Sequence, residues 1–163
     1  MRYQINMTKK FTSGFFLYLI QAAVFCTLLF AGKSTKIVPP VASNGGSHIV
    51  FIEDQFDEAL KQGRLQNKYI FVDAYATWCG PCKMLKARTF TDDKAAAFFN
   101  ANFINVSIDM EKGQGPALAV QWQLQAYPTL IIFNPQGKPV LGTVGYIKAD
   151  DLIRFGKQAL TKQ

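Results

Sequence analysis

The sequence predicts an α/β fold in which a mixed central β-sheet is flanked by helices on both faces. Strand and helix candidates alternate along the chain after residue 48. The segment 69–76 (YIFVDAYA) is apolar on both faces apart from Asp73, which is typical of a central strand covered by helices on each side. The last two strand candidates, 129–133 and 140–146, are joined by the short turn 134–138 (NPQGK), which indicates an antiparallel hairpin.

The other elements are predicted from residue spacing and capping. In chain order they are a strand at 49–52, a helix at 54–65, a helix from about 80 toward 89, a helical segment capped by Thr91 or Asp92, a strand at 103–108, a helix from Pro116 to about 123 and a helix at 149–160. Apolar residues at helical spacing indicate the first helix, and a proline suits the first turn of the helix at Pro116. A side-chain oxygen at Thr91 or Asp92 can accept the free N–H groups of the following turn.

The N-terminal segment, residues 1–32, has the layout of a secretory signal or a signal anchor. Residues 1–14 carry three positive charges and no acid, and residues 15–31 (FFLYLIQAAVFCTLLFA) are almost wholly apolar. The positive end is expected to stay in the cytoplasm and the rest to be exported, to a bacterial periplasm. These seventeen residues, which include Gln21 and Thr27, are at the short limit for a membrane span. A cleavable signal peptide, with Gly32 and Ser34 at the cleavage site, and a retained inner-membrane anchor both stay open.

Residues 33–47 combine Pro-Pro with Asn-Gly-Gly-Ser and predict a tether, which leaves residues 48–163 as one domain. The net charge is +7, but four of the 18 basic residues lie in the first 33 positions, and all 11 acidic residues lie beyond them. Beyond residue 33, the small excess of basic over acidic residues is scattered along the chain and forms no arginine-rich stripe. This composition argues against nucleic-acid binding.

Two cysteines separated by two residues follow the central strand in the run 78–83 (WCGPCK). This spacing allows a switch between dithiol and disulfide. If Gly80 or Pro81 opens the helix, Cys79 lies at its N-terminus, where free backbone N–H groups favour a thiolate. Cys79 is then the attacking sulfur, and Cys82, one turn further along, can resolve a mixed disulfide.

The alternative of a zinc site is disfavoured because a closed structural site needs four ligands. The chain has no second cysteine pair, and its only histidine is His48. Gly113 and Gly115 lack the third glycine of a dinucleotide-binding motif. We expect no metal and no cofactor beyond a redox-active Cys79–Cys82 disulfide.

Asp73 is the one acid in the predicted central strand. Burial of an isolated carboxylate is costly, so its pKa is expected to rise, which suits a proton acceptor. A half-exposed strand position is the alternative, because strand registers are hard to fix from sequence.

The chain resembles the thioredoxin-like superfamily over roughly residues 49–162. The resemblance rests on Asp73 followed at this spacing by the run 78–83, on the sequence 127–129 (YPT) before an apolar strand, and on Gly145 in the last strand. In the run 88–92 (RTFTD), which continues into a phenylalanine-rich helix, it is similar in particular to the exported thioredoxin-like domains of thiol:disulfide interchange reductases. Lys86-Ala87 stands where thioredoxin has a helix-kinking proline, and the basic residue that accompanies thioredoxin's buried aspartate would fall near Asn105.

The resemblance implies a role for each site residue. The catalytic residues would be Cys79, Cys82 and Asp73, with Asp73 deprotonating Cys82, and the substrate-binding residues would be Trp78, Gly80, Pro81, Tyr127 and Pro128. The Tyr127–Pro128 bond would be cis and would turn the backbone of Tyr127 toward Cys79, whereas a strand-start proline is the ordinary alternative. Trp78 would cover the disulfide and offer apolar surface to a partner. Gly80-Pro81 is the dipeptide of reducing members.

Three functions follow from these observations. The first is an exported or membrane-tethered oxidoreductase that reduces disulfides of other proteins and is recharged by a thiol electron donor, with a membrane thiol carrier as one candidate. The second is an oxidase or isomerase that assists the folding of exported proteins. The third is a docking or chaperone module with a vestigial cysteine pair, against which the intact set Asp73, Trp78 and Pro128 argues.

Overall fold

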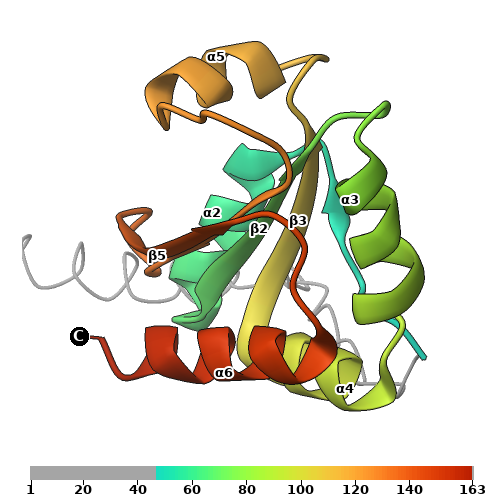
Figure 1. Ribbon diagram of the computed structural model, residues 1–163. Coiled ribbons are helices and arrows are strands. Elements are labelled where there is room, and N and C mark those ends of the chain that lie inside the picture. The colour runs from blue at the N-terminus through green and yellow to red at the C-terminus, as the bar shows by residue number, and fades with distance from the viewer. Residues whose placement is uncertain (1–46, 163) are drawn as a thin grey trace, which may run out of the picture. The chain divides into compact units, whose positions relative to one another are not determined.

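The computed structural model describes residues 47–162, which form a five-stranded sheet covered by helices (Figure 1). The strands are β1 Ile52–Glu53, β2 Tyr69–Tyr75, β3 Phe103–Asp109, β4 Thr129–Phe133 and β5 Pro139–Val144, in the order β1-β3-β2-β4-β5. The first three run parallel to one another, while β4 is antiparallel to β2 and β5 is antiparallel to β4. The predicted mixed sheet is therefore confirmed.

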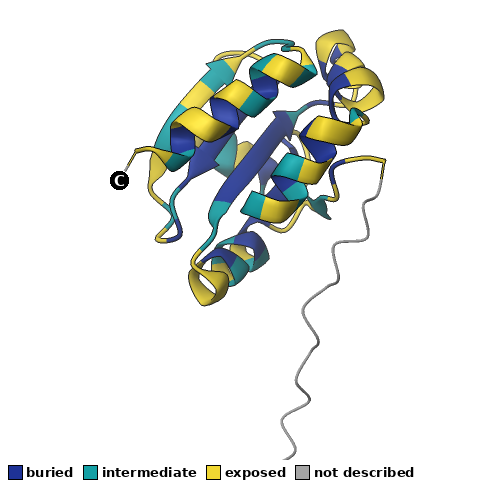
Figure 2. Ribbon diagram, turned by 90° about the horizontal axis from the view of Figure 1, so that it is seen from below, coloured by how far each residue is buried: buried dark blue, intermediate teal, exposed yellow. Residues whose placement is uncertain are grey.

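The helices are α2 Phe56–Gln66, α3 Gly80–Met84, the π-helix η1 Leu85–Thr89, α4 Asp93–Asn102, α5 Gly115–Gln121 and α6 Ala149–Leu160. The predicted bounds of α6 are met at both ends. Asp92 caps α4, because its Oδ1 accepts hydrogen bonds from the N–H groups of Lys94 and Ala95 at 3.0 and 2.9 Å. Figure 2 shows the buried central strands between helices whose outer sides are exposed.

Alternate residues of each central strand supply two apolar cores, one on each face of the sheet. On one face, Phe71 packs with side chains of η1, α4 and α6. On the other, Ile70, Val72 and Ala74 pack with α2 and α5. Since side chains two residues apart point to the same face, Asp73 lies on the face that α3, η1 and α6 cover. This alternation positions the carboxylate for the site described below.

The first strand is shorter than the prediction of 49–52 and begins later. Side chains occupy the backbone groups that would otherwise join the ladder: the N–H of Val50 donates to Asn100 Oδ1 at 2.9 Å, and its C=O accepts from Asn105 Nδ2 at 3.2 Å. The N–H of Ile49 donates to the C=O of Phe90 at 2.7 Å. The side chains of Asn100 and Asn105 thus hold the backbone at Val50. Because these residues are distant in the chain, the local sequence around residue 50 could not predict where the strand begins.

The single helix predicted from 80 toward 89 is in fact α3 followed directly by η1. In η1 the N–H of Phe90 donates to the C=O of Leu85 at 2.9 Å, five residues back. A π-turn of this kind interrupts regular α-helical geometry without a proline. The π-turn includes Lys86-Ala87, the place where thioredoxin has its helix-kinking proline, so the helix is interrupted here by a different local structure.

The C-terminal hairpin is confirmed, but β5 ends at Val144 and not at Tyr146 as predicted. Gly145 follows the strand with a φ of 93°, a conformation that does not continue a β-ladder, and its N–H donates to the C=O of Pro128 at 2.8 Å. Gly145 is thus outside the last strand, contrary to the prediction. The hydrogen bond connects the end of β5 to the loop before β4.

The N-terminal signal or anchor and nearly all of the tether, residues 1–46, lie outside the described residues. Within residues 47–162, no helix has both the length and the apolar character needed to span a membrane.

Candidate functional site

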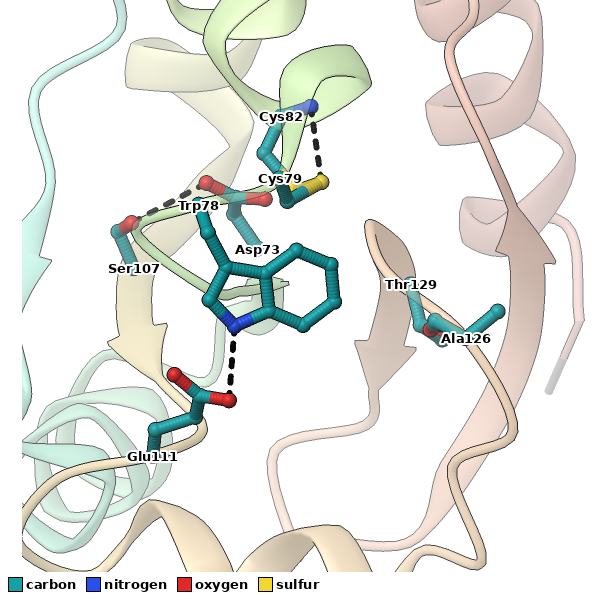
Figure 3. Close-up of a disulfide and its surroundings, with 8 residues drawn as sticks. All are labelled: Asp73, Trp78, Cys79, Cys82, Ser107, Glu111, Ala126 and Thr129. Carbon is teal, nitrogen blue, oxygen red and sulfur yellow. Dashed lines mark hydrogen bonds between the residues drawn. A yellow bond between two sulfur atoms is a disulfide. The ribbon is translucent and has the colours of Figure 1, made fainter.

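The cysteine pair joins the end of β2 to the start of α3 (Figure 3). Cys79 and Cys82 form a disulfide with Cα atoms 5.3 Å apart. Cys79 is the N-cap of α3, and its Sγ accepts a hydrogen bond from the N–H of Cys82 at 3.1 Å. A donor aimed at this sulfur stabilises a thiolate there, because hydrogen bonds to the charged form favour it. The residues Gly80 and Pro81 between the cysteines are exposed.

The loop before β4 lies against the cysteines. The Tyr127–Pro128 peptide bond is cis, as the resemblance implied. Tyr127 is half-buried and packs against the small cluster formed by Ala76, Cys79 and Cys82, and Pro128 is buried. The Thr129 hydroxyl donates to the C=O of Ala126 at 2.7 Å and closes the loop. The substrate-binding residues that were predicted on two distant segments are therefore brought to one site.

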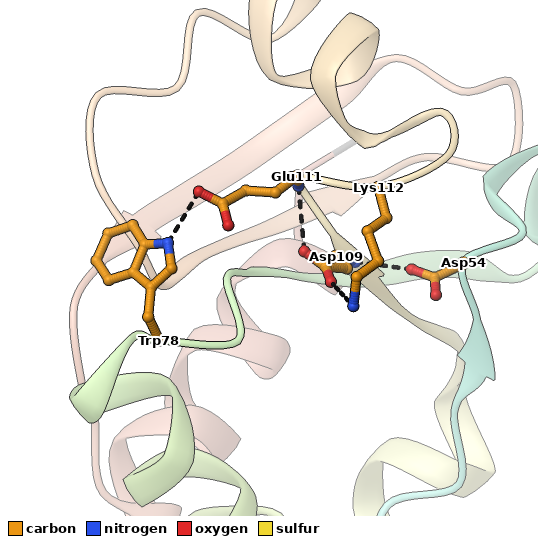
Figure 4. Close-up of polar contacts among 5 residues, drawn as sticks. All are labelled: Asp54, Trp78, Asp109, Glu111 and Lys112. Atoms are coloured by element: carbon orange, nitrogen blue, oxygen red, sulfur yellow. Dashed lines mark hydrogen bonds and ion pairs between the residues drawn. The ribbon is translucent and has the colours of Figure 1, made fainter.

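Trp78 lies at the outer rim of this site and is 65% exposed. Its Nε1–H donates to Glu111 Oε1 at 2.8 Å, and its ring meets that of Tyr127 edge to face at 6.2 Å. Figure 4 shows how the loop after β3 holds Glu111, whose N–H donates to Asp109 Oδ1 at 3.1 Å. Two loops therefore orient the indole, and its large exposed face is available to a partner.

Asp73 is buried, with 1% of its surface exposed, so the half-exposed alternative is wrong. The Ser107 hydroxyl donates to Asp73 Oδ2 at 3.1 Å. Within the described residues, the other oxygen, Oδ1, accepts no hydrogen bond. Figure 3 shows the carboxylate between Ser107 and the cysteine pair. One oxygen is thus fixed by β3, and the other remains able to take a proton.

Burial raises the pKa of Asp73 from its usual 3.8 to about 6. The positive charge of Lys86 and the hydrogen bond from Ser107 oppose this rise, whereas the negative charge of Glu53 adds to it. A carboxylate with a pKa near neutrality exchanges protons readily at physiological pH. The arrangement therefore places an acid–base group beside a disulfide.

The neighbours of Asp73 differ from those that the resemblance suggested. Asn105 lies two residues before Ser107 on the same face of β3, and its Nδ2 donates to Val50 O and Asn100 Oδ1. Asn105 therefore binds the backbone of the segment before β1 and is not the partner of Asp73. The cation that acts on Asp73 is Lys86, from the helical segment above the sheet.

The site also contains Ser107, Lys86 and Glu111, which were not predicted as site residues from the sequence. The polar residues Asn105, Ser107 and Asp109 alternate through an otherwise apolar, buried strand, and this pattern would have marked one face of β3 as polar. Lys86 and Glu111 carry no such signal, because only packing brings them near Asp73 and Trp78. Among residues 47–162, no group of three or more His, Cys, Asp or Glu side chains is placed to hold a metal ion.

Comparison with known proteins shows which family has this geometry. The family model of the thioredoxin-like domain matches residues 56–160. A thioredoxin-like protein of Synechocystis is 39% identical over 87 residues, which cover 53% of this chain and 77% of that protein. The solution structure of a candidate disulphide-isomerase from Bacteroides thetaiotaomicron is 40% identical, covers 71% of this chain and 96% of that one, and superimposes with a TM-score of 0.63. The thiol:disulfide interchange protein DsbD of Pseudoalteromonas atlantica is 25% identical over 170 residues, which cover 97% of this chain but 28% of that protein.

Proposed function

This chain belongs to the thioredoxin-like family of disulfide oxidoreductases, and we propose that it is an exported reductase of protein disulfides. The observation that carries the proposal is the Cys79–Cys82 disulfide at the start of α3, packed against the cis-proline loop. Cys79 acts as the nucleophile, Cys82 as the resolving thiol and Asp73 as the proton acceptor. No other cofactor is required for this chemistry.

The first exchange begins with the dithiol form. The Cys79 thiolate attacks one sulfur of a substrate disulfide, forming a mixed disulfide and releasing the other substrate sulfur as a thiolate. The hydrogen bond from the N–H of Cys82 to Cys79 Sγ supports the choice of Cys79, because this donor stabilises the thiolate. Trp78, Gly80 and Pro81 supply exposed surface beside the sulfur, and Tyr127 lies on the other side.

The second exchange releases the substrate. Cys82 gives its proton to Asp73, directly or through water, and its thiolate attacks Cys79 Sγ in the mixed disulfide. The Cys79–Cys82 bond forms, the bond from Cys79 to the substrate breaks, and the second substrate sulfur leaves as a thiolate that takes up a proton. The substrate disulfide is thereby reduced and the Cys79–Cys82 dithiol oxidised. A thiol electron donor must then restore the dithiol.

The direction of electron flow is tested by the reduction potential of the Cys79–Cys82 pair. The dipeptide Gly80-Pro81 supports a reductase, for which a potential near that of thioredoxin, about −270 mV, is expected. Equilibration of the full-length protein with defined ratios of reduced and oxidised dithiothreitol gives this value. A potential near −120 mV, typical of a strong oxidant, would favour the alternative of a disulfide oxidase.

Export is proposed from the basic segment 1–14 followed by the apolar segment 15–31, which places the domain on the outer side of a bacterial inner membrane. In that compartment, protein disulfides form and persist and are available as substrates. The thiol electron donor would then have to pass reducing equivalents across the membrane, which is the reason to propose a membrane thiol carrier. The relatives include DsbD, a thiol:disulfide interchange protein, which supports a thiol as the electron donor.

Replacing Asp73 with asparagine is expected to slow the second exchange by about tenfold to a hundredfold at pH 7, while the first exchange stays near its normal rate. Only the second exchange needs a proton acceptor beside Cys82. Stopped-flow traces that follow formation and decay of the mixed disulfide separate the two steps. Equal slowing of both steps, or no effect on either, would remove Asp73 from the mechanism.

The dependence of the free energy of unfolding on pH provides a control that Asp73→Asn is correctly folded. Because its pKa in the folded state lies above the unfolded value, Asp73 contributes stability below pH 3.8 that is lost as the pH rises through about 6. Asp73→Asn avoids this loss and is expected to have a free energy of unfolding greater by roughly 2 to 3 kcal/mol at pH 8, with the difference shrinking below pH 4. Denaturant unfolding at the two pH values measures it and excludes misfolding as the cause of slow turnover.

A further inference from the structure

We infer that Lys86 is a positioning residue that keeps Asp73 ionised for the second exchange, because its ammonium is held over the ring of Tyr75 on the face of β2 that carries Asp73. The inference rests on the proposed role of Asp73 as the proton acceptor. The cation that controls the ionisation of Asp73 is then in η1. The resemblance had instead suggested a cation on β3, near Asn105.

The position of Lys86 is fixed by contacts on both sides of it in the chain. Its Nζ lies 3.5 Å from the centroid of the Tyr75 ring. Tyr75 is two residues after Asp73 in β2, so both side chains point to the same face of the sheet. Leu85, the first residue of η1, and Phe90, the residue that follows it, are buried in the core that contains Phe71, on that same face. The cation–π contact and this packing together hold the charge above the site.

A row of aligned residues across three strands explains why a cation is needed at this place. Glu53 of β1 pairs in register with Ser107 of β3, and Ser107 pairs with Asp73 of β2. Two carboxylates therefore flank a single hydroxyl on one face of the sheet. The Ser107 hydroxyl donates to Asp73, and burial and the charge of Glu53 both favour the protonated form of Asp73. Lys86 is the positive charge that opposes them.

The other groups around Asp73 do not substitute for Lys86. Cys79 and Cys82 face it from α3 as a disulfide, without charge. Asp109, further along β3, is paired with Lys112, with Nζ 2.9 Å from Oδ2. Burial raises the pKa of Asp109, but this ion pair and the N–H of Glu111 outweigh it and hold that pKa below its usual range. Lys112 is therefore the ion-pair partner of Asp109, whereas the positive charge of Lys86 opposes the rise in the pKa of Asp73 and also favours the ionised forms of Glu53 and Asp109.

The expected consequence is a change in the titration of Asp73. In the full-length oxidised protein, NMR of the carboxyl carbon of Asp73 should give a midpoint near pH 6. Lys86→Met is expected to raise that midpoint by about one pH unit, because it removes the positive charge that lowers the pKa of Asp73. The exposure of Lys86 to solvent places the shift at the low end of the roughly 1 to 3 units that an opposite charge produces. Lys86→Arg should leave it nearly unchanged. Lys83→Met is the matched control, because Lys83 is also exposed, lies three residues away and does not act on Asp73.

Kinetics then connect the titration to the reaction. The rate of the second exchange should fall on the acid side with the same midpoint as Asp73, and Lys86→Met should move both midpoints together. A midpoint that stays near pH 6 in Lys86→Met, or a shifted midpoint with an unshifted rate profile, overturns the inference. The titration uses the oxidised protein and needs no turnover, so failure of the proposed reductase function would appear separately, as a wild-type protein that reduces no disulfide.

Discussion

Cys79→Ser is expected to abolish the reduction of a protein disulfide driven by dithiothreitol, leaving only the rate of dithiothreitol alone. The first exchange requires a thiolate, and a serine hydroxyl cannot form the mixed disulfide. The structure supports Cys79 as this nucleophile through its place at the N-cap of α3 and the hydrogen bond that its sulfur accepts from Cys82. The measurement is the initial rate of disulfide reduction by the full-length variant and the wild type.

Two controls separate lost chemistry from lost structure. Serine is close to cysteine in size, so under reducing conditions the variant should unfold at nearly the same temperature as the wild type. Lys83→Met changes an exposed residue next to Cys82 and should keep most of the activity. Near-normal turnover by Cys79→Ser would show that the assigned mechanism is wrong.

Cys82→Ser should instead trap substrates covalently on Cys79. The first exchange still takes place, but no thiol is left to attack the mixed disulfide, so it accumulates. When the variant is produced in cells, non-reducing gels should show adducts of higher mass that disappear on reduction, and their composition identifies the protein substrates.

The chain contains a third cysteine, Cys26, and the control must exclude adducts on it. The double variant Cys79→Ser/Cys82→Ser retains Cys26 and should give no adducts. If Cys82→Ser is produced at normal levels and traps nothing beyond this double variant, a protein substrate is contradicted. The alternative of a docking or chaperone module would then gain support.

Local sequence pattern determined most of the secondary structure. The predicted helix 149–160 and strand 129–133 have the observed bounds, because apolar spacing alone specifies them. The strand 49–52 was misplaced since the backbone of Val50 is bound by Asn100 and Asn105, more than 45 residues away in the chain. The helix from 80 was predicted as continuous because no sequence rule marks the π-turn at Leu85–Thr89.

The chemistry proposed for this protein was predicted from local residue patterns: a CGPC pair after an apolar strand, an aspartate in that strand and a Tyr-Pro sequence before a later strand. Residue type and spacing decide which sulfurs can pair, and these are local properties. The surroundings of Asp73 depend on the tertiary structure: strand register places Ser107 beside Asp73 and Glu53 on the far side of Ser107, and helix packing places the Lys86 ammonium over the Tyr75 ring. The pKa of a buried carboxylate depends on such neighbours and on desolvation, which are set by residues distant in the chain.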